Sequence, residues 1–139
     1  MSRIIVDRTF TDTDVKNAIN TMSNDLYNGT PLALVYIVTL TQTSTNAPVA
    51  TVISDTITGI TWARTAVGTY TATKAGAFTL GKTTPNTTGA SANDIAGNKI
   101  TAEQTSVNVI TVKTYAAADT TVLADGVLTN QEFQIKIYQ

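Results

Sequence analysis

Short runs of β-branched and aromatic residues, each closed by turn residues, recur along this chain and constrain its fold more than any other feature. Leu34–Val38 is the one long apolar run, and its residue types suit a pleated, buried strand. Val49–Ile53, Ile60–Arg64 and Thr69–Thr73 repeat the strand pattern between polar turns. The pattern predicts a mainly β fold, either a β-sandwich or a meander-type antiparallel sheet. Its central strand would be Leu32–Leu40, which is apolar on both faces through Ile37 and is expected to be covered on both.

The second half of the chain carries further strand patterns. They fall at Ala75–Leu80, Lys99–Glu103, Val107–Tyr115 and Glu132–Tyr138. In the last of these, Phe133, Ile135 and Ile137 alternate with polar residues, so we expect these three side chains to face the core. Residues 81–98 are polar and rich in Gly and Asn, which predicts a long loop.

One amphipathic helix is predicted near the N-terminus, from Asp14 to Tyr27. Its apolar stripe follows the helical repeat and consists of Val15, Ala18, Ile19, Met22 and Leu26. Asp12, Thr13 or Asp14 can cap its start, and Asn28-Gly29 favours its end. We expect the stripe either to complete the core or to contact another subunit. The chain is therefore predicted to be a single domain, with an arm and helix in residues 1–30 and a β domain in residues 31–139.

Composition argues against several classes of partner. With 139 residues, of which 42% are hydrophobic and 14% charged, the chain has the make-up of one folded domain. Its net charge of −1 and its scattered basic residues do not suit nucleic-acid binding, which requires clustered Lys and Arg. No segment has transmembrane length, and the N-terminus lacks the apolar run of a signal peptide. We therefore expect neither nucleic acid nor a membrane as partner.

No set of residues with catalytic character stands out, and we expect no enzyme activity, no cofactor and no metal. The chain has no Cys and no His, which removes thiol nucleophiles, Ser-His-Asp triads and imidazole or thiolate zinc ligands. Asp119 and Asp125 fall in turn-like sequences, where a carboxylate serves the backbone, and both are expected to be solvated. Gly76–Thr83 satisfies the spacing of a phosphate-binding loop, but Pro85 opposes the helix that such a loop must open.

Trp62 and Tyr70 form the candidate ligand surface. They fall on neighbouring predicted strands and could meet across them, and exposed aromatic rings offer a platform on which a sugar can stack. Packing within the sheet is the alternative for the same pair, and the aromatic content of only 6% favours packing.

Several short phrases of this sequence resemble a type of small protein found in tailed phages and prophages of Bacteroidetes. In that group an LTQ-x-G/S-T-x-APVATV hairpin precedes a Trp-containing strand, a VG-x-YT strand and a closing LADG-L-N-x-x-x-I-I-Y segment. The matching residues here are Leu40–Gln42, Ala47–Val52, Trp62, Val67–Thr71, Leu123–Gly126 and Ile135–Tyr138. The phrases leave out the predicted helix and the polar loop.

The resemblance implies a virion structural protein, either a capsid decoration or auxiliary protein or a head-fibre component. Its partners would be other virion proteins and further copies of itself, with a homotrimer favoured, and it would be made in the host cytoplasm. The assembly interface would use the arm, the helix stripe and the central strand, through Ile4, Val15, Ile19, Met22, Leu26, Val35 and Ile37. A carbohydrate- or receptor-binding β-sandwich module, adhesin-like or tail-associated, is the alternative, with Trp62 and the polar loop as its surface.

Overall fold

The computed structural model describes residues 33–87 and 97–139, and the described residues are mainly β and contain no helix. The strands are β1 (Ala33–Thr41), β2 (Val49–Asp55), β3 (Thr61–Ala66), β4 (Thr69–Thr73), β5 (Thr83–Thr87), β6 (Lys99–Gln104), β7 (Val109–Ala116), β8 (Asp119–Leu123) and β9 (Gln131–Tyr138). The predicted N-terminal helix and the arm before it lie outside the described residues. The same holds for five residues of the predicted assembly interface, which are Ile4, Val15, Ile19, Met22 and Leu26.

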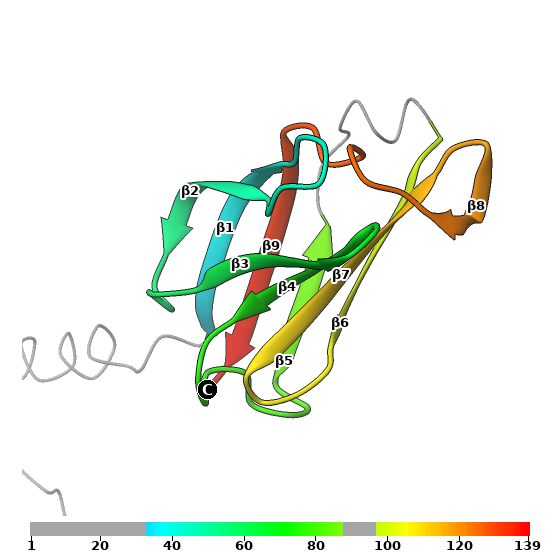
Figure 1. Ribbon diagram of the computed structural model, residues 1–139. Coiled ribbons are helices and arrows are strands. Elements are labelled where there is room, and N and C mark those ends of the chain that lie inside the picture. The colour runs from blue at the N-terminus through cyan, green and yellow to red at the C-terminus, as the bar shows by residue number, and fades with distance from the viewer. Residues whose placement is uncertain (1–32, 88–96) are drawn as a thin grey trace, which may run out of the picture. The chain divides into compact units, whose positions relative to one another are not determined.

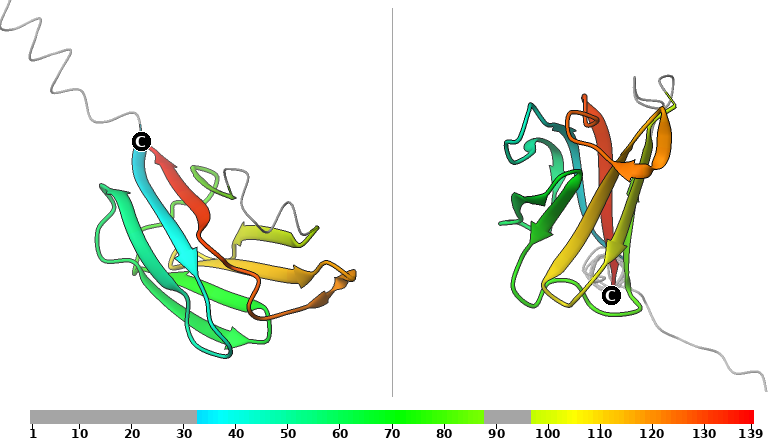
Figure 2. Two further views of the ribbon diagram at one scale, coloured as in Figure 1. Left: turned by 90° about the horizontal axis from the view of Figure 1, so that it is seen from above. Right: turned by 45° about the vertical axis from the view of Figure 1, so that its right-hand side comes forward.

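The strands form two antiparallel sheets (Figure 1). The order in the first sheet is β2-β1-β9-β5, and in the second β3-β4-β7-β6, where β8 also pairs with β7. The pairs β1–β2 and β3–β4 are hairpins within one sheet, whereas the links from β2 to β3 and from β4 to β5 pass to the other sheet. Figure 2 shows the two sheets facing each other. Of the two predicted arrangements, the two-sheet one is therefore observed, and the single meander is not.

Strand β1 lies between β2 and β9, as its apolar sequence predicts, but only one of its faces lies in the core. Its inward residues Tyr36, Val38 and Leu40 are buried. Val35 and Ile37 point to the outer face of the sheet and are half-buried, so among the described residues the outer face is not covered as expected. They lie opposite Lys136 and Gln134 of β9, whose long side chains can shield an apolar neighbour while the polar ends stay in water. An antiparallel sheet needs only one apolar face.

The core is built from alternating residues of both sheets. The predicted alternation of the last strand is confirmed, because Phe133, Ile135 and Ile137 of β9 are buried. The second sheet contributes Tyr70 and Ala72 of β4 and Ile110 and Val112 of β7. The connections add Ile57, Phe78 and Leu128. One apolar cluster thus joins the two layers, as two packed sheets require.

The prediction for residues 75–98 was wrong in two places, the expected strand and the expected loop. Ala75–Leu80 forms turns and a bend instead of a strand, and Phe78 is anchored there because its N–H donates to the Val107 carbonyl at 2.9 Å. The polar segment expected to be a loop instead contains β5, at the edge of its sheet, where a proline such as Pro85 is tolerated. The phosphate-loop spacing at Gly76–Thr83 therefore runs into a strand.

Candidate functional site

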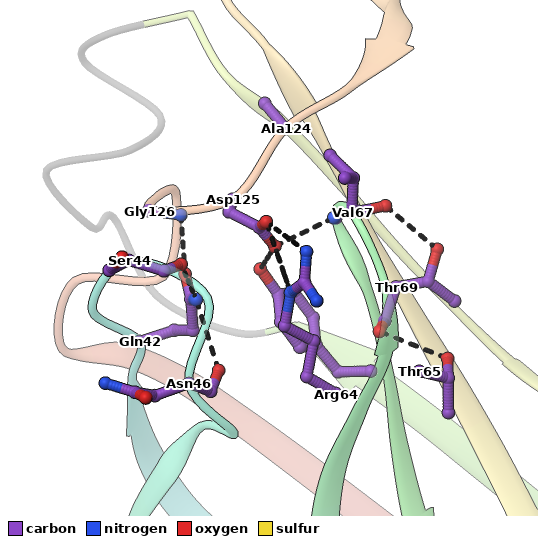
Figure 3. A network of polar contacts seen from close by, with 12 residues as sticks. Gln42, Ser44, Asn46, Arg64, Thr65, Val67, Thr69, Ala124, Asp125 and Gly126 are labelled. Atoms are coloured by element: carbon purple, nitrogen blue, oxygen red, sulfur yellow. Dashed lines mark hydrogen bonds and ion pairs between the residues drawn. The ribbon is translucent and has the colours of Figure 1, made fainter.

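A polar network at one end of the two sheets centres on Asp125, in the connection between β8 and β9 (Figure 3). We define the Asp125 network as Arg64, Gly68, Tyr70 and Asp125. The Arg64 guanidinium donates from Nε at 3.0 and 3.2 Å and from Nη2 at 2.7 Å to the two carboxylate oxygens. The Gly68 N–H and the Tyr70 hydroxyl each donate to Asp125 Oδ1 at 2.9 Å. One carboxylate therefore joins β3, the β3–β4 turn, β4 and the β8–β9 connection.

The backbone at Gly68 fixes the position of this carboxylate. Gly68 has a φ of +55°, and its carbonyl accepts a hydrogen bond from the Thr114 N–H at 2.9 Å. The Ala124 N–H donates to the Thr114 carbonyl at 3.0 Å, and the Thr114 hydroxyl donates to the Ala124 carbonyl at 2.6 Å. A Cβ atom on Gly68 would lie 2.6 Å from both the Ala124 nitrogen and the Thr114 oxygen. Only glycine fits this turn, both for its φ and for the close approach of the backbone.

The network shifts the pKa values of Asp125 and Tyr70 further away from neutral pH. The Arg64 guanidinium is the main cause that lowers the pKa of Asp125 to about 2; burial opposes it, and the Gly68 and Tyr70 donors add to it. Burial is the main cause that raises the pKa of Tyr70 to about 12. A general acid or base works best with a pKa near the working pH. At neutral pH the Asp125 carboxylate stays charged and the Tyr70 phenol stays protonated, so both serve as fixed hydrogen-bonding partners.

Gln42 adds a second clamp beside the Asp125 network (Figure 3). Its side chain is buried, and its Oε1 accepts a hydrogen bond from the Gly126 N–H. Its Nε2 donates to the carbonyls of Ser44 and Asn46, while its backbone N–H donates to the Leu128 carbonyl at 2.8 Å. The β1–β2 turn and the β8–β9 connection are thereby held together.

Sequence reasoning misplaced Asp125, which was expected to be a solvated turn residue. It is instead the hub of the network, with only 16% of its side chain exposed. Asp119 is solvated as expected: it is the exposed first residue of β8, just after the β7–β8 turn, and it accepts a hydrogen bond from the N–H of Thr121 at 2.9 Å. Three of the phrases that carry the resemblance meet here, and they supply Gln42, then Gly68 and Tyr70, then Asp125 and Gly126. These phrases are the only feature of the sequence that pointed to the network residues, and the residues in them stabilise the fold.

The structure separates the two residues of the predicted ligand surface. Tyr70 has no exposed surface, which removes it from that surface. Trp62 is half-buried, its ring meets Phe133 edge-to-face at 5.4 Å, and its Nε1 donates to the Tyr36 hydroxyl at 3.1 Å. Trp62 lies opposite Ala72 in the β3–β4 ladder, whereas Tyr70 lies opposite Arg64. Trp62 is thus the member of the pair that reaches solvent.

The edge strand β2 presents an exposed apolar surface. Val49, Val52 and Ile53 are 67%, 54% and 60% exposed, and among the described residues β2 pairs with β1 alone. An edge strand offers unpaired backbone N–H and C=O groups, so it can accept a further strand. We refer to Val49, Val52 and Ile53 as the β2 patch. It is the part of the described surface best suited to contact another chain.

Comparison with protein-family models, with curated proteins and with solved structures finds no match. Within residues 33–87 and 97–139, the acidic side chains form no group that could hold a metal ion. A search of the same residues finds no helix with the length and apolar character needed to cross a bilayer.

Proposed function

We propose that this chain is a structural protein of a bacteriophage virion, a capsid decoration or auxiliary protein or a head-fibre component that acts by assembly. The β2 patch is the observation that carries the proposal, because three large apolar side chains are exposed on a strand that lies at the edge of its sheet among the described residues. Exposed apolar surface of this kind is typical of sites that contact other proteins. The sequence resemblance supplies the setting of a virion.

The character of the remaining surface supports the same proposal. Threonine is abundant along the strands, and outward positions such as Thr51 and Thr61 are exposed. Threonine is β-branched and polar, so it suits a sheet whose outer face meets water. A β-sandwich with a water-compatible face and, among its described residues, an open edge at β2 fits a subunit that acts through its shape.

The test is detection of the chain in purified phage particles. Mass spectrometry should find it at a fixed number of copies per particle, and immunogold labelling should place it on the head or a fibre. Deleting Met1–Gly29 removes the predicted helix stripe and should abolish attachment while the β domain remains folded. Particles that lack the chain would contradict the proposal, and a truncated form that attaches as well as the full chain would contradict the role of the helix stripe in attachment.

A carbohydrate- or receptor-binding module is the second candidate, and the partly exposed ring of Trp62 favours it. An aromatic ring at the surface can stack on a sugar. A glycan array should then show binding that Trp62→Ala removes and Tyr138→Ala retains, since Tyr138 is another exposed aromatic residue. Because Trp62 also packs on Phe133, circular dichroism must show that the variant is folded. An array without hits would leave the assembly proposal alone.

A further inference from the structure

Strand β2 differs from the other edge strands in the described part of the chain. Natural proteins protect sheet edges with proline, charged side chains, bulges or short strands. Strand β5 carries Pro85 in its middle, and β6 carries Lys99 and Glu103. Strand β3 has Arg64 beside a register shift, and β8 is short and irregularly paired. Each of these edges carries one of the usual obstacles to pairing with another strand.

Strand β2 has almost none of these devices. Its sequence Val-Ala-Thr-Val-Ile-Ser-Asp contains no Lys, Arg, Pro or Gly, and its only charge is at its last residue, Asp55. Its one irregularity is a bulge near Ile53, and the register from Val49 to Val52 against β1 is regular. The stretch Val49–Val52 is therefore an open, uncharged template for another strand.

We propose that β2 pairs antiparallel with β2 of a second copy of this chain, around a twofold axis at Thr51. The contact rests on the proposed function, since it names a partner for the β2 patch. In this register Thr51 meets its own copy, Val49 lies opposite Ile53, and Ala50 lies opposite Val52. The apolar residues of the β2 patch then pair with apolar residues of the other copy. The two β2-β1-β9-β5 sheets become one continuous sheet.

The distribution of charge favours a second copy in this orientation. Parallel pairing would place the two Asp55 carboxylates side by side, and like charges directly opposite one another are destabilising. Antiparallel pairing around Thr51 moves them to opposite ends of the ladder, about 27 Å apart at the usual rise per residue. A strand that is apolar and neutral over its regular part suits a partner of the same kind. A twofold contact of one patch with itself satisfies this requirement.

The contact changes the expected stoichiometry. A twofold contact between identical strands closes on itself and yields dimers or larger even-numbered assemblies, whereas the sequence resemblance favoured a trimer. Sedimentation equilibrium on the full chain should therefore fit a reversible dimer. A trimer, or a monomer at every concentration, would overturn the proposal.

A single cysteine tests the twofold axis directly, because the chain contains no other. Residues opposite each other in an antiparallel pair have Cα atoms within the range that a disulfide spans. Under mild oxidation, Thr51→Cys should cross-link to a covalent dimer at least about tenfold faster than Thr65→Cys. The reason is that two thiols held side by side react faster than two thiols that must meet by diffusion. Thr65 is an exposed threonine on β3, at the edge of the other sheet. Equal cross-linking of the two variants would overturn the contact.

A charge test uses matched valines. Val52→Lys should raise the dimer dissociation constant at least about tenfold, because two added cations would face the same apolar interface. Val67→Lys should change it less than about twofold, since Val67 is equally exposed at 52% but lies in the β3–β4 turn. Circular dichroism of both variants checks the fold. Dimerisation of Val52→Lys that equals that of the unaltered chain would place the contact elsewhere and overturn the proposal.

Three further outcomes show whether this contact or the proposed function fails. A monomeric full chain in which the Thr51→Cys thiol resists alkylation would assign the edge to the chain's own residues 1–32 or 88–96, and would overturn the contact. A chain that is present in virions but does not pair through β2 would overturn only the contact. A chain that dimerises through β2 but is absent from virions would overturn only the proposed function.

Discussion

The Asp125 network and the β2 patch differ in how their side chains are accommodated. In the network, one carboxylate accepts hydrogen bonds from Arg64, Gly68 and Tyr70, all within the chain. Across the described residues, every buried side-chain nitrogen or oxygen has a hydrogen-bonding partner. In the β2 patch, three large apolar side chains remain in contact with water. The network satisfies its polar groups within one chain, whereas the patch leaves its apolar side chains exposed.

The difference assigns separate roles to the two regions. A buried polar group without a partner is costly, so a saturated network makes the fold specific but leaves nothing to bind a ligand. Exposed apolar area costs a single chain little, and its burial against another chain is favourable. Substitutions in the network should therefore affect unfolding, and substitutions in the patch should affect association.

Among substitutions in the Asp125 network, Gly68→Ala should lower the stability of the fold most. Its Cβ would lie 2.6 Å from backbone atoms of Thr114 and Ala124, and the φ of +55° disfavours any side chain. We expect the free energy of unfolding to fall by about 4 kcal/mol or more, measured by urea denaturation.

Gly76→Ala is the matched control. Gly76 has a φ of +63° and nothing within 4 Å of an added Cβ, so only the backbone cost of about 1–2 kcal/mol should appear. Equal effects of the two substitutions would show that the close approach at Gly68 is not what holds the turn.

Asp125→Ala should be the next largest effect. It leaves the guanidinium of Arg64, which is only 20% exposed, and the hydroxyl of the buried Tyr70 without their carboxylate. We expect a loss of about 2–3 kcal/mol in the free energy of unfolding. Asp119→Ala removes only contacts to Thr121 at the exposed start of β8 and should cost clearly less stability than Asp125→Ala. Equal losses would refute the role of Asp125 as a hub.

The sequence predicted the strands with strong local patterns. The strands β1, β2, β3, β4, β6, β7 and β9 were all expected, with ends that differ by two residues or fewer. Each has either an apolar run or a clear alternation, which are local signals. Strands β5 and β8 were missed because both are short and rich in polar residues, and Pro85 argues against a strand. Their pairing depends on the strands beside them.

The Asp125 network could not be predicted from residue chemistry, because its members are distant in the sequence. Arg64, Gly68 and Tyr70 lie 61, 57 and 55 positions before Asp125. The Leu123–Gly126 phrase correctly indicated a turn, but no local pattern shows which side chains such a turn will meet. The β2 patch was hidden for a related reason, since an apolar strand pattern does not show whether the strand is central or at an edge.

Acid should weaken the network before it affects the β2 patch. The pKa of Asp125 is lowered to about 2 in the folded chain, against about 3.9 for an unperturbed Asp. A depressed folded pKa gives stability that is complete above the unfolded value and is lost as the pH falls through the folded value. Unfolding followed by fluorescence should therefore show a decline in stability between about pH 4 and pH 2. Asp125→Asn should flatten this decline, and an unchanged profile in the variant would contradict it.

Gln42→Ala should have a moderate effect on stability. It removes the acceptor of the Gly126 N–H and the donor to the Ser44 and Asn46 carbonyls, and it leaves a void at a buried position. We expect a loss of about 2 kcal/mol in urea denaturation. Gln134→Ala, on the outer face of β9, should cost less than about 0.5 kcal/mol. If both cost the same, the second clamp does not contribute.

Val52→Thr should have the smallest effect on unfolding, and it separates most clearly an effect on stability from an effect on self-association. The substitution adds a hydroxyl at a side chain that is 54% exposed, so in dilute solution the free energy of unfolding should change by less than about 0.5 kcal/mol. The same exchange at Val112, which is fully buried in β7, should cost about 2 kcal/mol because the hydroxyl loses water. At higher concentration Val52→Thr should weaken self-association, since it removes apolar area from the β2 patch. A large loss of stability in the dilute chain would show instead that Val52 belongs to the core. The Asp125 network and the β2 patch would then no longer have separate roles in folding and association.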